Sequence, residues 1–180
     1  MDGRLHVRPA LAGDIDAIAR IHVRAWQHAY RGQIPDDVLA ALDARERAAR
    51  WREWLERPDH VLQVAVRERV IVGFCSLIRA RDADAKDTDG EIAALYVDPE
   101  SWRTGAGAAL VDAAVVQAHA LGYRVLTLWV LVSNASARRF YERVGFSPDG
   151  ESKVETRPGY SLAEMRYRRE LDASPAGAVS

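Results

Sequence analysis

The spacing of apolar residues along the chain predicts helices and strands in alternation. The short alternating run at 5–8 is typical of a strand, which Pro9 ends. Apolar residues then recur at helical spacing over 14–30 and again over 36–55. The first part of the chain is therefore expected to form one strand and two helical regions.

Runs rich in β-branched and other apolar residues dominate the part that follows. Those at 61–66 and 70–78 flank a polar turn and predict a hairpin. A polar loop over 79–90 is expected to lead into a strand at 92–97. The further expected elements are a helix at 106–122, a strand at 124–131, a short helix at 135–144, a strand beginning near 146 and a last strand at 163–171.

The run at 124–131 says most about the architecture. It is apolar without clean alternation, as in a central strand that helices cover on both faces. No repeat or linker interrupts the chain. We therefore expect one α/β domain over 1–180, with a core at 4–171, a flexible tail at 172–180 and a central mixed sheet.

Composition narrows the functional classes. A formal net charge of −1 and a pI near 6.5 remove any bulk electrostatic attraction to nucleic acid or membrane surfaces. Cys75 is the only cysteine, which excludes an internal disulfide and a multi-cysteine zinc site. The chain has no apolar run of about 18 residues, and its first residues carry charges where a signal peptide needs an apolar core. We expect a cytoplasmic protein with no membrane segment and no nucleic-acid partner.

The stretch 102–108, Trp-Arg-Thr-Gly-Ala-Gly-Ala, joins a predicted strand to a predicted helix. Its glycines, Gly105 and Gly107, would let the backbone approach an anion closely, and the first N–H groups of a helix have no partner within it. The helix dipole would add attraction for a phosphate. A tight strand-to-helix connection explains the same glycines without a ligand. The three-glycine spacing of a dinucleotide-binding fold and the Gly-Lys-Ser/Thr of a Walker A loop are both absent.

A second group of candidate residues lies on the short helix. Asn134 can cap this helix and still offer an amide to a ligand, and Tyr141 follows two turns later on roughly the same face. A capped amphipathic helix, with Phe140 and Val144 in the core, explains the same pattern without a site.

The order of these segments resembles the GCN5-related N-acetyltransferases, the GNAT family. The resemblance covers about residues 4–171 and rests on three motifs: Glu91-Ile-Ala-Ala-Leu-Tyr-Val-Asp-Pro99, Trp102-Arg-Thr-Gly-Ala-Gly107, and Asn134 with Phe140-Tyr-Glu-Arg-Val-Gly-Phe146. It implies a three-layer α/β (α+β) fold, in which about four helices flank a mixed, mostly antiparallel sheet of about seven strands that splays between the fourth and fifth. It also implies an acetyl-CoA-dependent N-acetyltransferase.

The resemblance further implies where acetyl-CoA would bind. The pantetheine arm would lie between 92–97 and 124–131, and the pyrophosphate would lie on the amides of the glycine loop. The cofactor-binding residues expected on this basis are Leu95, Tyr96, Val97, Arg103, Thr104, Gly105, Ala106, Gly107, Ala108, Asn134 and Tyr141. One position departs from the family pattern, because Trp102 stands where Gln or Arg is usual.

Amine acetylation needs a base for the acceptor ammonium and an acid for the departing thiolate. The resemblance assigns the base to Glu91, acting directly or through water, and the acid to Tyr141, with a backbone N–H near Val97 polarising the thioester carbonyl. A solvated charge at a strand entrance is the alternative explanation for Glu91.

The acceptor is the least determined part of the site. Trp26 and Tyr30, together with Glu91, are its candidate contacts, because the family builds this pocket from the first helices and nearby loops. Core packing explains Trp51 and Trp54 of the second helical region better than a binding role does, because their spacing is helical. The acidic loop residues Asp82, Asp84, Asp87 and Asp89 do not match a calcium-binding loop, so no metal is expected, and they weakly favour a cationic acceptor.

Three functional hypotheses follow. The first is acetylation of a small-molecule amine, and the second is acetylation of a protein N-terminal α-amine. The third is a CoA-binding module without turnover. Transfer of a longer acyl group remains open, as does a homodimer formed through the C-terminal strands.

Overall fold

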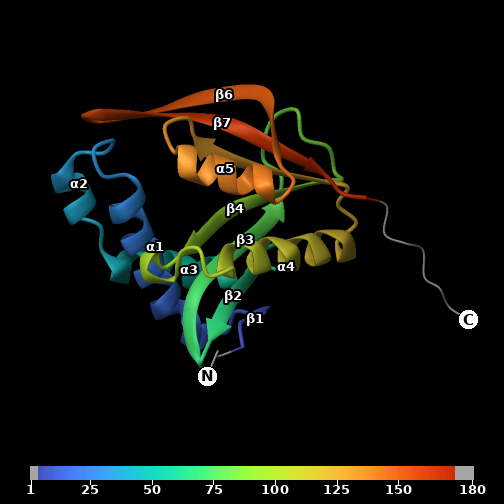
Figure 1. Cartoon of the computed structure of the whole chain (residues 1–180), viewed down its shortest axis with the longest axis horizontal. Helices are drawn as coiled ribbons and strands as arrows, with labels where there is room; N and C mark the ends of the chain where they lie inside the picture. The colour runs from blue at the N-terminus through green and yellow to red at the C-terminus, as the bar shows by residue number, and fades with distance from the viewer. Residues whose placement is uncertain (1–3, 173–180) are drawn as a thin grey trace, which may run out of the picture.

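The computed structural model describes residues 4–172, whose seven strands join in one mixed sheet (Figure 1). The strand order is β1-β2-β3-β4-β5-β7-β6, and only the β4–β5 pair is parallel. The strands are β1 (His6–Pro9), β2 (Val61–Arg67), β3 (Val70–Arg79), β4 (Asp89–Val97), β5 (Val125–Leu131), β6 (Ser147–Arg157) and β7 (Tyr160–Glu170). The expected fold, with its seven mostly antiparallel strands, is confirmed.

Helices cover both faces of the sheet and complete the three layers. They are α1 (Ile15–Ala29), α2 (Asp36–Ala40), α3 (Ala44–Leu55), α4 (Ala106–Ala120) and α5 (Ala135–Arg143). One core cluster packs α4 against the sheet through Leu110 and Val111, with Leu126 and Leu128 of β5. A second cluster packs α1 and α3 against the other face, through Ile18 and Trp51. Figure 1 shows α4 and α5 over the near face.

The structure corrects three boundaries expected from the sequence. The second helical region, 36–55, divides into α2 and α3, because the Asp43 side chain accepts a hydrogen bond from the Arg45 N–H and starts a new helix. β4 begins at Asp89, before the expected 92. β7 begins at Tyr160, because β6 and β7 form one long hairpin through Gly159.

A β-bulge in β4 matters for the site. Ile92 pairs with Leu77 of β3, whereas Ala94 pairs with Ser76, so Ala93 is an extra residue on β4. Such a bulge bends a strand and increases its twist. It lies directly after the last pair that β4 makes with β5, at Glu91.

The expected tail at 172–180 lies almost wholly outside the described residues. Among the residues described, no helix combines the length and the apolar character needed to cross a membrane.

Candidate active site

The central feature of the site is the separation of β4 from β5. The two strands pair only at 89–91 with 125–127, although β4 continues to Val97 and β5 to Leu131. β5 pairs along its whole length with β7, so the gap lies on its β4 side. The edge of β4 over 92–97 therefore has backbone groups with no strand opposite them, and an extended ligand can pair with this edge as an added strand would.

The glycine loop lies at the open end of this cleft and presents free donors. Within residues 4–172, the backbone N–H groups of residues 103–108 donate no hydrogen bond. Gly105 caps α4 with a φ of 89°, and a side chain added there would meet no atom within 4 Å. The Arg67 side chain holds the loop from β2, through a 2.8 Å hydrogen bond to the Thr104 carbonyl. A row of free amides at a helix N-terminus fits a phosphate or pyrophosphate.

Gly107 has a different structural requirement from Gly105. A Cβ at Gly107 would lie 3.1 Å from the Phe140 ring of α5 and 3.8 Å from Val97. Its missing side chain therefore lets α4, α5 and the end of β4 meet closely. This packing brings the loop, the end of β4 and α5 together.

Trp102 occupies the position that departs from the family pattern. Its indole N–H donates to the Val97 carbonyl at 2.8 Å, and its ring contacts His28 edge-on at 4.7 Å between centroids. The side chain thus ties the glycine loop to the last residue of β4 and to α1. At this position Trp102 contacts the protein itself, whereas a Gln or Arg could offer a polar contact to a ligand.

α5 carries the two other predicted ligand contacts. The side-chain Oδ1 of Asn134 accepts from the Ala137 N–H at 3.1 Å, which caps the helix and leaves the side-chain NH2 free of protein partners in the described chain. Tyr141 packs against Phe140 and Phe146. Burial raises the pKa of Tyr141 above its ordinary value, and the neighbouring Tyr96 and Cys75 raise it further. This hydroxyl therefore stays protonated, as a general acid requires.

Glu91 lies at the closed end of the cleft. It pairs with Thr127 of β5, and its side chain is 5% exposed. The Arg81 guanidinium binds both of its oxygens, at 2.6 and 3.1 Å. Leu95 lies four residues further along β4, or about 13 Å at the rise of a strand. Within residues 4–172, no hydrogen bond or ion pair joins the Glu91 side chain to another predicted site residue.

An aromatic cluster lines the cleft on the face that α1 covers. The Trp26 indole N–H donates to the Tyr96 hydroxyl at 2.9 Å, and Tyr30 packs edge-on against Trp26. His22 stacks on Tyr96 at 4.9 Å and accepts a hydrogen bond from the Trp51 indole. Burial lowers the pKa of His22 to about 3. The structure thus brings the predicted acceptor contacts Trp26 and Tyr30 next to Tyr96, while Trp51 belongs to the core.

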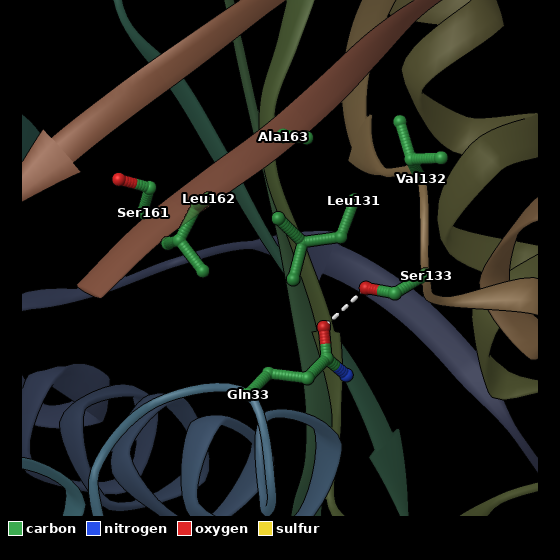
Figure 2. Close-up of a pocket in the computed structure, with 7 residues that line it drawn as sticks. All are labelled: Gln33, Leu131, Val132, Ser133, Ser161, Leu162 and Ala163. Carbon is green, nitrogen blue, oxygen red and sulfur yellow. Dashed lines mark hydrogen bonds between the residues drawn. The ribbon is translucent and has the colours of Figure 1, made fainter.

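Two pockets adjoin this cluster and share Leu162. The first, of about 370 Å³, lies between the loop after α1, the end of β5 and β7. Figure 2 shows Gln33 reaching across it to the Ser133 hydroxyl. The second, of about 250 Å³, is called the arginine pocket below. It is lined by Trp26, Ile34, Val38, Leu39, Leu42, Arg47, Arg50, Glu155, Arg157, Tyr160 and Leu162.

Three of the four acidic loop residues form ion pairs with arginines. Arg166 binds Asp84 at 2.7 Å and Asp82 at 3.1 Å, and Arg79 pairs with Asp87. Within residues 4–172, no group of three or more His, Cys, Asp and Glu side chains could hold a metal ion.

Comparison with known proteins decides the family. The Acetyltransferase (GNAT) family model matches residues 16–146. The chain belongs to this family.

Individual relatives agree with this GNAT assignment. The chain is 33% identical over 140 residues to the uncharacterized N-acetyltransferase Mb2688 of Mycobacterium bovis, covering 76% of this chain and 85% of that protein. It is 37% identical over 120 residues to an amino-acid acetyltransferase of Pseudomonas fluorescens, covering 67% of this chain and 25% of the relative. The structure of YncA from Salmonella typhimurium, solved with its cofactor acetyl-CoA, superposes with a TM-score of 0.73 at 24% identity, over 97% of this chain and 99% of that one.

Two residues near the cleft of this GNAT acetyltransferase, Arg47 and Tyr160, were not predicted from the sequence. Arg47 stacks over the Trp26 ring, with its guanidinium carbon 5.2 Å from the ring centroid, and Tyr160 comes from the C-terminal hairpin. Nothing local in the sequence distinguishes Arg47 from the other arginines of α3. Only the folded hairpin brings its neighbours together.

Proposed function

We propose that this GNAT acetyltransferase transfers the acetyl group of acetyl-CoA to the primary amine of a small molecule, by direct attack in a ternary complex. The observation that carries the proposal is the cleft between β4 and β5, with an unpaired strand edge along one side and free amides at its mouth. Side chains along the free edge of β4 alternate between the two faces of the sheet. Leu95 and Val97 belong to the α4 side, and Tyr96 belongs to the α1 side.

The chain's own groups fit acetyl-CoA. The β4 edge at 95–97 would pair with the pantetheine arm, and the amides of residues 103–108 would hold the pyrophosphate. The free amide of Asn134 would contact the arm. The open space at Gly105 leaves room for the phosphates next to the backbone. The acetyl-CoA bound by the YncA relative supports the same cofactor for this chain.

The acceptor would approach from the opposite face, through the aromatic cluster. The arginine pocket shares Trp26 with this cluster and holds a molecule of about amino-acid size. Its walls come from α1, α2, α3 and the β6–β7 hairpin. A pocket enclosed in this way favours a small molecule over the N-terminus of a folded protein, which needs an open groove.

Acetyl-CoA supplies the activated acetyl group when bound. Tyr141 would donate its hydroxyl proton to the leaving sulfur, because burial keeps that proton in place at neutral pH. Glu91 would take the proton from the acceptor ammonium. Since Arg81 binds both of its oxygens, and Leu95 lies about 13 Å away along β4, that proton would pass through intervening water.

Steady-state assays of CoA release with a panel of small primary amines test this proposal. We expect turnover that yields an N-acetylated product. We also expect kcat to fall in Tyr141→Phe and in Glu91→Gln. Exclusive turnover of N-terminal peptides would contradict the small-molecule proposal. Wild-type kcat in both variants across pH 6 to 9 would contradict the two residue roles.

A further inference from the structure

The arginine pocket contains a cation that has no carboxylate partner within the part of the chain that the structure describes. Arg47 projects from α3 and is half-buried, with its guanidinium over the Trp26 ring. Within residues 4–172, its guanidinium makes no ion pair and no hydrogen bond, although its backbone N–H donates to the Asp43 carbonyl. Burial and the neighbouring Arg50 lower the pKa of Arg47 from its ordinary value. A half-buried guanidinium without a carboxylate is costly to the folded state unless a ligand binds it.

Two nearby carboxylates pair with other cations, and Glu46, which also lies near Arg47, forms no ion pair with it within residues 4–172. Glu155 lines the same pocket but pairs with Arg157, and Glu164 lies 3.5 Å from Lys153. The lining as a whole carries three arginines and one glutamate. The pocket is therefore positively charged, whereas Asp82, Asp84 and Asp87 of the acidic loop are paired with arginines.

Arg47 is also connected to the reacting part of the cleft. Its guanidinium lies over Trp26, and the Trp26 indole N–H donates to the Tyr96 hydroxyl. Tyr96 in turn lies close to Tyr141. A small molecule held at Arg47 therefore extends past Trp26 toward the Tyr96 side of the cleft, which is where the acceptor amine must be.

From this arrangement we infer that the acceptor is a primary amine that carries a carboxylate on an apolar frame, as an α-amino acid does. Arg47 binds the carboxylate, because a guanidinium and a carboxylate match in geometry and charge. Leu39, Leu42 and Tyr160 contact the apolar part. This inference rests on the proposed amine acetylation and names its substrate class.

The test compares matched acceptors. L-leucine, L-methionine and L-phenylalanine are each assayed beside the corresponding carboxamide, with acetyl-CoA as donor. The wild type is expected to turn over the amino acids with the lower KM. Arg47→Gln is expected to raise the KM for the amino acids about 10- to 100-fold, while the carboxamides keep their KM. Arg47→Lys restores part of the preference. Arg45→Gln makes the same charge change at an exposed position of α3, and it is expected to leave the KM for the amino acids and the KM for the carboxamides unchanged.

Two further readouts separate the possible explanations. Calorimetric titration of each variant with acetyl-CoA reports the donor site alone, so intact donor binding with lost carboxylate preference supports the inference. If Arg47→Gln lowered kcat equally for the amino acids and the carboxamides, Arg47 would only position Trp26. That result would overturn the inference. A wild-type preference for the carboxamides would also overturn it, as would no turnover of any amino acid by protein that binds acetyl-CoA. Absence of acetyl-CoA binding by the wild type would instead contradict the proposed function itself.

Discussion

The indole N–H of Trp102 donates a 2.8 Å hydrogen bond to the Val97 carbonyl, and so joins the glycine loop to the last residue of β4. The loop would hold the pyrophosphate of acetyl-CoA, and β4 would hold its pantetheine arm. Trp102 therefore fixes the position of the two proposed cofactor-binding segments relative to each other, at a site where the family usually has a polar side chain.

Trp102→Phe removes this donor but keeps an aromatic ring against His28. We expect the free energy of unfolding to fall by about 1 kcal/mol, together with weaker binding of acetyl-CoA. Denaturant unfolding and calorimetry measure the two effects. Trp54→Phe is the control, since the Trp54 indole has no hydrogen-bond partner within the described part of the chain. Equal binding by the two variants and the wild type would show that Trp102 does not position the cofactor site.

Tyr141→Phe tests the proposed acid. We expect kcat to fall about 100-fold or more, with little change in the affinity for acetyl-CoA. Because burial raises the pKa of Tyr141, the wild-type enzyme is also expected to keep its kcat as the pH rises to 9. Tyr123→Phe, which removes a hydroxyl outside the cleft, should leave kcat unchanged. A wild-type kcat that declines between pH 7 and 9, while the protein remains folded, would contradict the acid role.

His22 is expected to make the protein sensitive to acid. The folded pKa of His22 is about 3, against an ordinary value of 6.5, so the unfolded chain binds a proton that the folded one does not. The free energy of unfolding should therefore decrease as the pH falls below 6.5 toward 3, by at most about 1.4 kcal/mol per pH unit from this residue.

Urea unfolding at several pH values measures this dependence. His22→Asn keeps an acceptor for the Trp51 indole and should flatten the slope between pH 6 and 4. His6→Asn, at an exposed position of β1, should keep the wild-type slope. The same slope in His22→Asn and the wild type would contradict the assignment.

The Gly107–Phe140 contact predicts a rescue. Gly107→Ala places a methyl group 3.1 Å from the Phe140 ring, so the ring must shift by a few tenths of an ångström, and we expect a net loss of up to about 1 kcal/mol of stability once the gain from Ala over Gly within a helix is included. Adding Phe140→Leu should recover part of the loss, because the smaller side chain leaves room for the methyl group. Thermal and denaturant unfolding of the single and double variants measures the coupling. Additive losses in the double variant would show that the two side chains do not compete for space.

Features that depend on local chemistry could be predicted from the sequence. Gly105 lies at a φ that favours glycine, and Asn134 caps α5 as its position predicted. The division of 36–55 was missed, because apolar spacing continues across the break that Asp43 creates. The ion pairs of the acidic loop were also missed. Arg166 and Asp84 lie 82 residues apart, and no local pattern indicates that β7 brings them together.

The arginine pocket shows the same limit at the site. Trp26, Arg47 and Tyr160 come from three separate elements, and each has an ordinary explanation within its own helix or strand. Their proximity results from the long β6–β7 hairpin, whose length could not be predicted from the polar residues of β6.

Calorimetric titration of the folded protein with acetyl-CoA tests the central claim most directly, with adenosine as the control ligand. The cleft between β4 and β5 predicts saturable one-to-one binding of acetyl-CoA, and a melting temperature that rises with its concentration. No heat of binding and no change in melting temperature, from protein that unfolds cooperatively, would contradict the account.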